Sequence, residues 1–540
     1  MDLQEKIASL LPSATIEQAQ YLTISVAKND LRKAAETLRH QLGFDILWSL
    51  TGMDWGTALG VVYHLASSAK PGEIVVLKTQ AEDRENPMLH TVCDLWATAE
   101  LNEREVYAMF GIRFINNPDM RKLLLNENWV GFPLRKDYNA DPELNPLNLH
   151  SDEVSDLRPK LVEQADGTVK EEWDEIFTNK EYIVNIGPQH PATHGVLHFR
   201  VSLDGEAIKK VDPHLGYIHR GIERMCESLT YPQMLHLTDR LDYLSAHMNR
   251  HAICMCVENA LQLEIPERVK YIRTLMDELT RIASHLLAWS CMCMDMGGLT
   301  AFIYGMRDRE KILSIFDDTC GGRLITNYNI IGGVMADIKP GFQKQVKEFI
   351  PYMRKMLKEH NAIYTGNVIA KNRMTGIGHM SRELSINQVV SGPSGRASGF
   401  SSDMRKHRPY GAYDKVKFNE IMRTEGDTFA RYSARLEEIS ASLDIIEQLI
   451  DNIPEGQSLV KTKAVIRLPE GEYMEWVEAA RGAFGVYICS KGEKTPYRVK
   501  FRSTGMPLVA VVDEISRDEK IADLIAIGGS LDYVVPDIDR

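Results

Sequence analysis

Residues 187–195 read Gly-Pro-Gln-His-Pro-Ala-Thr-His-Gly, so that His190 and His194 stand in a segment with two prolines and two glycines. Residues 182–186 before it are rich in β-branched side chains, and residues 197–203 after it alternate apolar and polar side chains as a half-buried strand does. We therefore predict a β-hairpin whose tip carries both histidines. Because proline and glycine fix the backbone there, an imidazole at the tip can meet a ligand and exchange protons near neutral pH. The simpler alternative is a surface turn that happens to contain histidine.

Length and composition exclude several classes of protein. A chain of 540 residues exceeds the size of a single hydrophobic core, so we expect more than one domain. The formal net charge of -12 and the lack of a concentrated basic segment disfavour a nucleic-acid-binding protein. No apolar stretch reaches the roughly 18 residues that a membrane-spanning helix needs. Any association with a membrane is therefore expected to be peripheral.

The eight cysteines do not predict a metal site or a disulfide scaffold. Cys254 and Cys256 are two residues apart, as are Cys291 and Cys293, and both pairs lie in apolar segments that we expect to be helical. Side chains two apart on a helix point about 200° away from each other, so neither pair can bind one metal ion without unwinding. We interpret them as buried free thiols.

The first part of the chain predicts a small α+β domain over residues 1–137. Residues 24–43 have the spacing of an amphipathic helix, and residues 44–50, 59–65 and 73–78 read as strands with turn residues between them. This order is typical of an antiparallel sheet with a helix packed on it.

Residues 138–175 predict a linker, because prolines and scattered charges replace apolar periodicity. Residues 176–540 begin with the histidine hairpin and then become helical. The periodic segments that predict a helical bundle are 222–263, 266–296, 301–320 and 341–363. Strand-like residues return in a terminal hairpin at 485–501.

Several polar residues interrupt the predicted helices. Asp239, Asp242 and Tyr243 lie in a Leu- and Met-rich segment that we interpret as helix, with the two carboxylates on one face. Asp295 ends an almost uncharged helix, where an ionised carboxylate opposes the helix dipole and needs a cation or a donor if it is buried. For each residue, a salt bridge between helices and a role in ligand binding remain open.

The 176–540 part resembles the 49-kDa (D) subunit of respiratory complex I. The motifs that carry this resemblance are 187–195, 212–221, 239–243, 395–399, 496–498 and the ending 530–540. The N-terminal domain is similar to the 30-kDa (C) subunit through 102–112 and 133–138. The resemblance thus implies a fused C/D subunit. Its fold would be α+β, with a small α+β domain, a linker, and a domain like the [NiFe]-hydrogenase large subunit that combines a β-hairpin sheet and a central helical bundle.

The resemblance also implies roles for individual residues. His194 and Tyr243 flank the quinone head group, with His190 as a further quinone-binding residue. Asp295 pairs with His194, so the catalytic residues would be His194, Tyr243 and Asp295. The two arginines that would lie toward the iron-sulfur cluster of a neighbouring subunit are Arg220 and Arg240.

By the same resemblance, the chain is a peripheral-arm subunit of a proton-pumping NADH:quinone oxidoreductase at the cytoplasmic side of the inner membrane. It would form the quinone-reduction site and bind no cofactor itself, with the quinone as substrate and a [4Fe-4S] cluster in the adjacent subunit. The expected partners are the cluster-bearing B-like subunit, the I-like ferredoxin subunit, the H-like membrane subunit and the G-like subunit. The sequence leaves open whether the quinone is ubiquinone or menaquinone.

Some residues depart from the family pattern, and they keep other readings open. Ala108 replaces an aspartate, and Ile325 and Ile330 stand where the family commonly has histidine and arginine. A scaffold subunit with an impaired quinone site therefore remains an alternative. Because the sequence does not name the electron donor, a related oxidoreductase that uses ferredoxin or another donor is a further alternative. A [NiFe]-hydrogenase large subunit is excluded, because that enzyme needs Cys-x-x-Cys pairs and the chain contains none.

Overall fold

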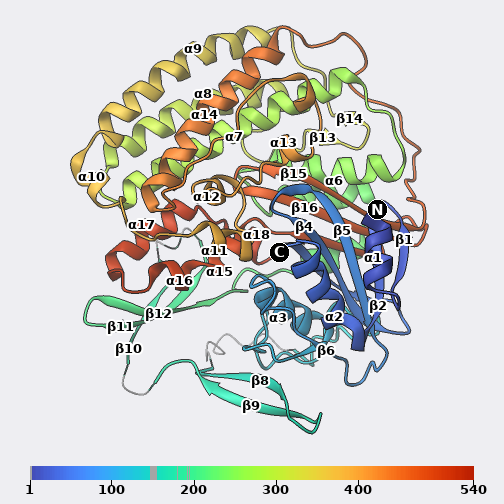
Figure 1. The fold of residues 1–540 in the computed structure, drawn as a ribbon. Helices are drawn as coiled ribbons and strands as arrows, with labels where there is room; N and C mark the ends of the chain where they lie inside the picture. Colours follow the sequence, from blue (N-terminus) through green and yellow to red (C-terminus); the bar gives the residue numbers. More distant parts are fainter. Residues whose placement is uncertain (1–2, 146–154, 179–180, 191–192, 194) are drawn as a thin grey trace.

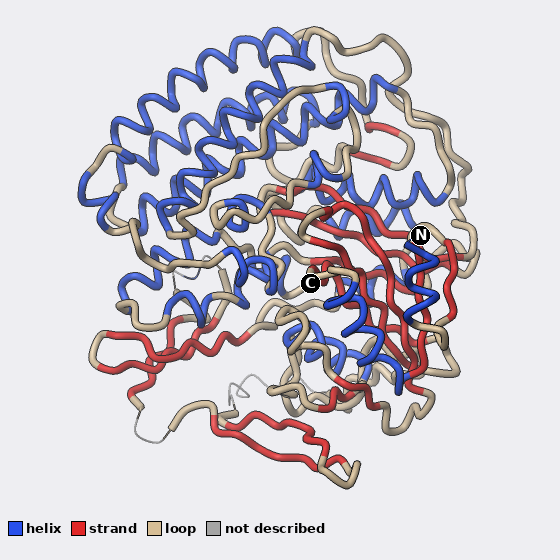
Figure 2. The backbone as a smooth tube through the Cα atoms, viewed as in Figure 1, coloured by secondary structure: helices blue, strands red, loops and turns tan. Residues whose placement is uncertain are grey.

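The computed structural model describes residues 3–145, 155–178, 181–190, 193 and 195–540, and it shows a mixed α/β architecture. An N-terminal sheet packs beside a C-terminal sheet, and a layer of long helices lies over the C-terminal sheet (Figure 1). Most of the long helices lie together on one side of the molecule (Figure 2). Within the described residues, we find no helix that is both long and apolar enough to span a bilayer.

The N-terminal sheet has the strand order β1-β2-β5-β4-β3. Its strands are β1 (Thr15–Gln18), β2 (Leu22–Ala27), β3 (Ile46–Asp54), β4 (Leu59–Ser67) and β5 (Lys70–Ala81). The predicted strands at 44–50, 59–65 and 73–78 are confirmed, and β3, β4 and β5 pair antiparallel as expected. The pairing of β2 with β5 is parallel, so the sheet is mixed rather than purely antiparallel.

The predicted helix over 24–43 is wrong in its first part. Residues Leu22–Ala27 form β2, and the helical part begins later, with α2 (Leu31–Glu36) and a π-helical turn at Thr37–Gln41. Leu22, Ile24 and Val26 alternate along the strand and are buried, which is the period-two pattern of a strand. Parallel pairing with β5, a contact distant in the sequence, decides in favour of the strand. The other helices of this unit are α1 (Leu3–Leu10) and α3 (Ala99–Phe110).

Part of the predicted linker is a β-hairpin. Strands β8 (Leu157–Glu163) and β9 (Val169–Glu175) pair antiparallel, and β8 joins β7 (Arg113–Ile115), which itself pairs with β6 (Met88–His90). This hairpin therefore extends a sheet of the N-terminal unit (Figure 1). Residues 146–154 lie outside the described residues.

The strands on both sides of the histidine segment are confirmed. Strand β10 (Tyr182–Ile186) pairs antiparallel with β11 (His198–Asp204), and β11 pairs with β12 (Ala207–His214). Ile186 lies opposite Phe199, so the chain reverses direction between β10 and β11.

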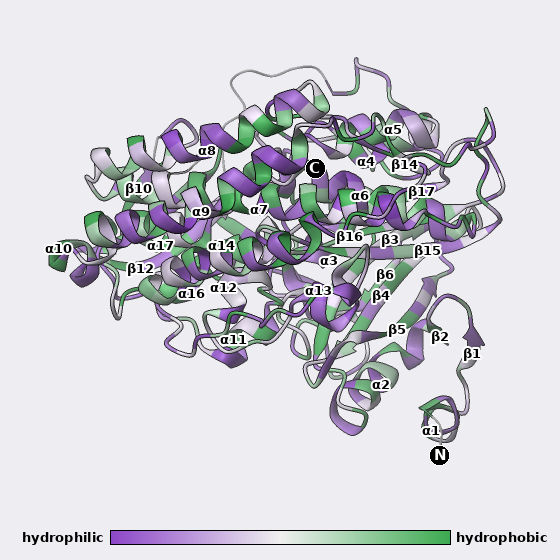
Figure 3. Cartoon of the chain, turned by 90° about the horizontal axis from the view of Figure 1, so that it is seen from above, coloured by the Kyte–Doolittle hydropathy of each residue, from purple (hydrophilic) through white to green (hydrophobic). Residues whose placement is uncertain are grey.

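The helical layer is formed by α7 (Glu267–Asp295), α8 (Leu299–Cys320), α9 (Phe342–His360) and α14 (Thr428–Ile450). The first three match the predicted segments, and purple and green alternate along α9 as expected for a helix with one buried face (Figure 3).

The predicted segment 222–263 is broken into three helices, α4 (Ile222–Ser228), α5 (Tyr231–Thr238) and α6 (Ala246–Ala260). Shorter elements follow: β13 (Asn329–Ile330), β14 (Gly333–Val334), α10 (Val368–Asn372), α11 (Arg382–Asn387), α12 (Gly392–Arg396) and α13 (Met404–His407).

The C-terminal sheet contains the predicted hairpin and one further strand. Strands β16 (Gly482–Ser490) and β17 (Arg498–Arg502) match the hairpin, and β15 (Gly471–Ala479) pairs with β16 on its other side. Trp48 of β3 packs against Trp476 of β15, with ring centroids 5.7 Å apart, in a shared apolar cluster between the two sheets. The chain ends with α15 (Gly505–Ala510), α16 (Val512–Ser516), α17 (Ile521–Leu531) and α18 (Val535–Ile538).

A buried group of charges joins the N-terminal unit to the rest of the chain. Glu105 of α3 forms ion pairs with Lys500 of β17 and with Arg540, whose Nη2 atom lies 2.7 Å from Oε2 of Glu105. Arg540 also contacts Glu223 of α4, with Nε 3.2 Å from Oε1. All four side chains are buried, so the two units share a desolvated ionic network.

Candidate functional site

A cavity of about 210 Å³ lies at the C-terminal end of α7. Its walls come from the turn after α5, from the last turns of α7 and from the segment after α17. The lining residues are Tyr243, Leu244, Leu287, Ala288, Cys291, Met294, Asp295, Asp532, Tyr533 and Val534. More than half of these side chains are not charged or phenolic, and two phenols and two carboxylates are the polar groups that can give direction to a ligand. Such a lining suits a small ring-shaped molecule with polar substituents.

Tyr243 reaches the cavity from a turn, not from a helix as the sequence predicted. Helix α5 ends at Thr238 and α6 begins at Ala246. Oδ1 of Asp242 accepts a hydrogen bond from the backbone N–H of Leu244 at 3.1 Å, which closes an Asx-type turn. This local bond competes with the helical backbone pattern and explains why the predicted helix is interrupted here. Burial raises the pKa of the Tyr243 phenol, so the hydroxyl keeps its proton as a donor.

The two aspartates of the same segment form ion pairs away from the cavity wall. Oδ2 of Asp239 lies 2.9 Å from Nη1 of Arg250, and Oδ2 of Asp242 lies 3.4 Å from Nη1 of Arg481. All four side chains are buried. Burial raises the pKa of Asp239 to about 6 and also raises the pKa of Asp242. For these two carboxylates, the salt-bridge interpretation is correct.

Asp295 is the last residue of α7 and is half-buried on the cavity wall. It lies on the same cavity as Tyr243, although 52 positions separate the two residues in the sequence. The long helix α7 positions this carboxylate, and the neighbouring α17 packs along it. The structure therefore brings together two of the three residues that were expected to act on the quinone.

The third residue, His194, lies outside the described residues, but its neighbours locate the end of the hairpin connection. The Thr193 side chain is buried, and its hydroxyl is 2.8 Å from the carbonyl oxygens of His190 and Gly195. A Cβ atom added at Gly195 would lie only 2.7 Å from Cγ2 of Val535. Since Val535 follows the cavity-lining Val534, the connection packs against the back of the cavity wall.

The other three residues singled out from the sequence are exposed. His190 lies at the hairpin connection and is not among the described residues that line the cavity. Arg220 precedes α4, and Arg240 lies in the turn that carries Tyr243. The predicted quinone contact of His190 and the predicted orientation of both arginines toward a partner's cluster stay predictions.

Comparisons with known proteins connect these elements to one family. Residues 24–143 match the model of the respiratory-chain NADH dehydrogenase 30 Kd subunit, and residues 295–466 and 459–540 match that of the 49 Kd subunit. The chain is 60% identical over 518 residues to the C/D subunit of NADH-quinone oxidoreductase from Phocaeicola vulgatus, covering 96% of this chain and 99% of the relative. The chain belongs to the family of NADH-quinone oxidoreductase C/D subunits.

Other relatives show that the two parts can also occur separately. The C/D subunit of the enzyme from Bacteroides fragilis is 56% identical over 536 residues, which cover 97% of this chain and all of the relative. The separate (D) subunit of NADH-quinone oxidoreductase from Bacillus anthracis is 43% identical over 365 residues, which cover 67% of this chain and all of that protein. The resemblance to a fused C/D subunit of complex I is confirmed.

One residue that lines the cavity and one residue behind it were not recognised as site residues from the sequence. Asp532 lines the cavity, and its backbone is left-handed, with a φ of 61°. Arg481 lies behind it: Nη2 is 3.0 Å from Oδ1 of Asp532, and Nε donates to the carbonyl oxygen of the same residue at 3.0 Å. Only the motif at 530–532 signalled Asp532, and nothing in the sequence linked it to an arginine 51 positions earlier.

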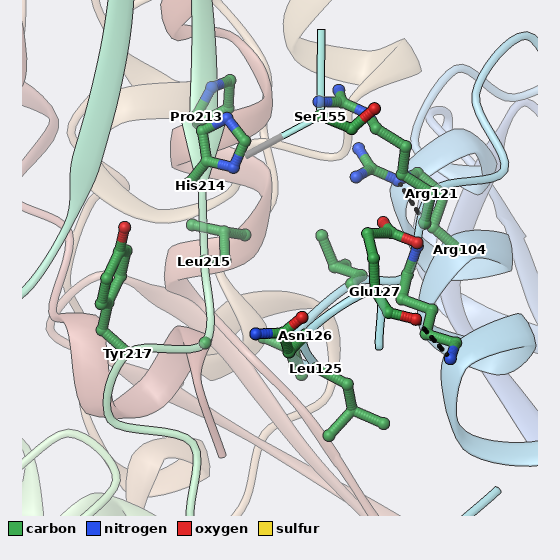
Figure 4. Close-up of a pocket in the computed structure, with 14 residues that line it drawn as sticks. Arg104, Arg121, Leu125, Asn126, Glu127, Ser155, Pro213, His214, Leu215 and Tyr217 are labelled. Atoms are coloured by element: carbon green, nitrogen blue, oxygen red, sulfur yellow. Dashed lines mark hydrogen bonds between the residues drawn. The ribbon is translucent and has the colours of Figure 1, made fainter. Parts of the chain in front are cut away.

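A second cavity, of about 230 Å³, lies between the N-terminal unit and the end of β12 (Figure 4). His214 and Tyr217 lie on one side of it and Arg121 and Glu127 on the other. Arg121 forms hydrogen bonds with both carboxylate oxygens of Asp212, at 2.8 and 3.1 Å, so its charge is already compensated. The strongly polar lining distinguishes it from the apolar cavity at Tyr243 and makes it a poorer site for an apolar ring.

The described residues contain no group of three histidine, cysteine, aspartate or glutamate side chains that could hold a metal ion. The cysteines of the 254/256 and 291/293 pairs are free thiols on α6 and α7.

Proposed function

We propose that the cavity at Tyr243 and Asp295 is the quinone-reduction site of the NADH-quinone oxidoreductase to which this subunit belongs. One observation carries this proposal: a phenol and a carboxylate, distant in the sequence, line one mainly apolar cavity. The apolar walls suit a quinone ring, and the polar groups suit its two carbonyl oxygens.

Quinone reduction adds two electrons and two protons and yields the quinol. In this proposal, the Tyr243 hydroxyl donates a hydrogen bond to one carbonyl oxygen and the protonated His194 imidazole donates to the other. Asp295 orients that imidazole and stabilises its positive charge. The raised pKa of Tyr243 supports its role, because the phenol stays protonated until the reduced quinone takes the proton.

The remaining parts of the proposal concern the setting of the site. The electrons come from a [4Fe-4S] cluster in an adjacent B-like subunit, toward which Arg220 and Arg240 face. Loss of the His194 proton leaves Asp295 without its cation, and this change couples the reaction to proton pumping in membrane subunits. The chain associates peripherally with the cytoplasmic side of the inner membrane and contacts H-, I- and G-like subunits.

We also propose a division of the chain into a C-like unit over 1–137, a connection over 138–175 and a D-like unit over 176–540. The D-like unit would share its fold with the [NiFe]-hydrogenase large subunit. Support comes from the matched family models and from the combination of a β-hairpin sheet with a bundle of long helices.

Tyr243→Phe tests the site directly, because it removes one hydroxyl and keeps the ring. We expect quinone reductase activity of the assembled complex to fall by about a hundredfold or more, as is typical when a positioned proton donor is lost. Reduction of ferricyanide by NADH should continue, because it bypasses the quinone. The matched control is Tyr231→Phe, since Tyr231 is a buried phenol with a raised pKa that does not line the cavity. Normal quinone reduction by Tyr243→Phe would refute the assignment.

A further inference from the structure

Helix α7 connects two cavities at opposite ends of the helical layer. Its first turns contribute Lys270 and Arg273 to an open cavity of about 420 Å³, and its last turns line the cavity at Tyr243. Between them, buried polar side chains recur at spacings of one to four residues. They are Thr274, Asp277, Glu278, Arg281, Ser284 and His285. Polar groups cost free energy inside a helical core, so a continuous polar face needs an explanation.

His251 stands at the outer end of this polar face. It lies on α6 and lines the open cavity, and its Nδ1 atom is 2.7 Å from Oδ2 of the buried Asp277. A carboxylate in this position holds the proton on Nδ1 and leaves Nε2 as the atom that exchanges protons with a ligand or water. The pair therefore has the geometry of a proton acceptor at a surface cavity.

Tyr410 connects this pair to a buried group of two carboxylates and one arginine. The Tyr410 ring packs edge-on against His251, with centroids 5.5 Å apart, and its hydroxyl accepts a hydrogen bond from the backbone N–H of Glu478 at 3.1 Å. Oε1 of Glu478 lies 2.7 Å from Nη1 of Arg396, which also pairs with Glu438. Arginine stays protonated, so Arg396 holds the two carboxylates in place and does not itself exchange a proton.

Glu478 can take part in proton transfer, and Glu438 serves beside it as an ionised hydrogen-bond acceptor. Burial raises the pKa of Glu438, but the Arg396 cation outweighs burial and lowers it well below its usual range. Burial raises the pKa of Glu478 to about 7, so this carboxyl group can bind or release a proton near neutral pH. Oε2 of Glu438 lies 2.8 Å from Nε2 of His285 on α7. Both glutamates and His285 are buried, and His285 brings the connection back to the polar face of the helix.

The inner end reaches the wall of the quinone cavity. Ser284 precedes His285, and its Oγ atom accepts a hydrogen bond from Nη1 of Arg481 at 2.5 Å. Arg481 in turn holds Asp532, which lines the cavity together with Tyr243. From Asp277 to Asp295, the helix rises by about 27 Å, so several exchanging groups are needed to cross it.

We infer that the buried polar face of α7 is a proton-transfer route that begins at the His251–Asp277 pair in the open cavity and ends at the cavity that holds Tyr243. The inference rests on the proposed quinone site. For each quinol formed, the quinone takes two electrons and two protons, the donors in the cavity lose those two protons, and two protons that enter at His251 restore them.

Internal water molecules would bridge the intervals between the exchanging side chains. Oδ1 of Asp277 and Nδ1 of His285 are buried, and neither has a hydrogen-bond partner within the described part of the chain. Buried polar atoms of this kind bind ordered water in folded proteins. The two atoms lie about 12 Å apart along the helix axis, Asp277 beside His251 and His285 beside Glu438.

A second buried histidine–aspartate pair offers a matched control. Nε2 of His360 lies 2.7 Å from Oδ2 of Asp308, and both residues are buried, as are His251 and Asp277. This pair joins α9 to α8 and lines neither of the two cavities. A purely structural role for buried pairs predicts similar effects for both histidines, whereas the proton route predicts an effect on quinone reduction only for His251.

The experiment compares His251→Ala with His360→Ala in the assembled, membrane-bound complex, with NADH as donor and a short-chain benzoquinone as acceptor. We expect His251→Ala to lower quinone turnover by about tenfold or more, with little change in KM and with normal ferricyanide reduction. The quinone turnover that remains in His251→Ala should fall by a larger factor in D2O than the turnover of the unaltered complex does. Imidazole added to the solution should restore turnover, because the vacated position opens into the cavity. His360→Ala should show neither the D2O effect nor the rescue.

The inference is wrong if His251→Ala matches His360→Ala while Tyr243→Phe still abolishes quinone reduction. If Tyr243→Phe is also active, the proposed quinone site itself fails. Should His251→Ala lose ferricyanide activity through faulty assembly, Asp277→Asn decides, because it keeps the shape of the side chain and removes its proton-accepting charge. Normal turnover and a normal D2O effect in Asp277→Asn would then refute the route.

Discussion

Oδ1 of Asp532 lies 3.0 Å from Nη2 of Arg481, and this buried ion pair holds a residue that lines the cavity. Arg481 also reaches Asp242, whose Oδ2 atom is 3.4 Å from Nη1. One guanidinium therefore joins the segment after α17 to the turn that carries Tyr243. The two wall segments hold their relative position through a charge that water does not reach.

We expect Asp532→Ala to lower the free energy of unfolding by about 3–5 kcal/mol, because it leaves the buried Arg481 cation with only one carboxylate. Urea unfolding of the purified chain measures this. Asp518→Ala is the matched control: Asp518 has nearly the same backbone, with a φ of 63°, but its ion pair with Lys209 is exposed. Asp518→Ala should lower the free energy of unfolding by about 1 kcal/mol or less, in addition to the backbone effect that both variants share. Equal losses would show that the backbone, not the ion pair, sets the cost.

Gly195→Ala should impair quinone binding without unfolding the chain. A Cβ atom there would come within 2.7 Å of Val535, and the hairpin connection would have to move away from the cavity wall. A displacement of this size in a site typically lowers kcat/KM by about tenfold to a hundredfold. Gly167→Ala is the control, because Gly167 also has a positive φ, of 80°, but has open space around its Cβ position. Unchanged quinone kinetics in Gly195→Ala would contradict the placement of the connection.

A double-mutant cycle tests whether His194 and Asp295 act as a pair. If Asp295 serves only to orient and stabilise the imidazole, then His194→Ala combined with Asp295→Asn should be no slower than the worse single variant. The measurement is kcat for quinone reduction by the four forms of the complex. If the reductions in kcat of the two single variants multiply in the double variant, His194 and Asp295 act independently.

Two glutamates of α3 should respond to pH in opposite ways. Burial raises the pKa of Glu103 to about 7, although it accepts hydrogen bonds from Thr91, Asn117 and the N–H of Val92. The folded chain then binds a proton between about pH 4.5 and 7 that the unfolded chain releases. The stability linked to this proton is complete below about pH 4.5 and is lost as the pH rises through about 7, for a total of about 3 kcal/mol.

Glu103→Gln should remove this part of the pH dependence, which thermal unfolding between about pH 5 and 8 would reveal. The control is Glu105→Gln. Burial raises the pKa of Glu105, but the Arg540 and Lys500 cations outweigh burial and lower it overall, so its stabilising contribution is present at neutral pH and is lost in acid. Its replacement should lower stability across the whole range and leave the decline between about pH 5 and 7 in place. An unchanged decline in Glu103→Gln would refute the assignment of that titration.

Local patterns predicted the parts of the fold that local physics decides. β-rich segments between turn residues located β3, β4 and β10, alternation of apolar and polar residues located β11, and the helical period located α7, α8 and α9. The errors lie where distant contacts decide. Residues 24–27 were predicted as the start of a helix, but they pair with β5 as part of β2, and the turn at 239–245 depends on a side-chain bond of Asp242. Strand β15 was not predicted, and its Glu475 and Glu478 are compensated by arginines from other segments.

The same difference between local patterns and distant contacts holds for the candidate site. Tyr243 and Asp295 stood out because a phenol and a carboxylate interrupt apolar segments, and both line the cavity. Arg481 and the role of Asp532 could not be predicted, since their meaning depends on a contact between segments 51 positions apart. The polar residues of α7 gave no signal either, because their partners on α6, β15 and α14 become visible only after folding.

The ionic network of Glu105, Glu223, Lys500 and Arg540 bears on how the two halves are made. Without the other half, Glu105 would lack both of its cations, and Lys500 and Arg540 would keep only Glu223 as a partner in this network. A single polypeptide supplies the two halves in equal copy number and at a high effective concentration, so docking becomes an intramolecular step. Synthesis as one chain thus shortens the time during which either surface is open to unrelated partners.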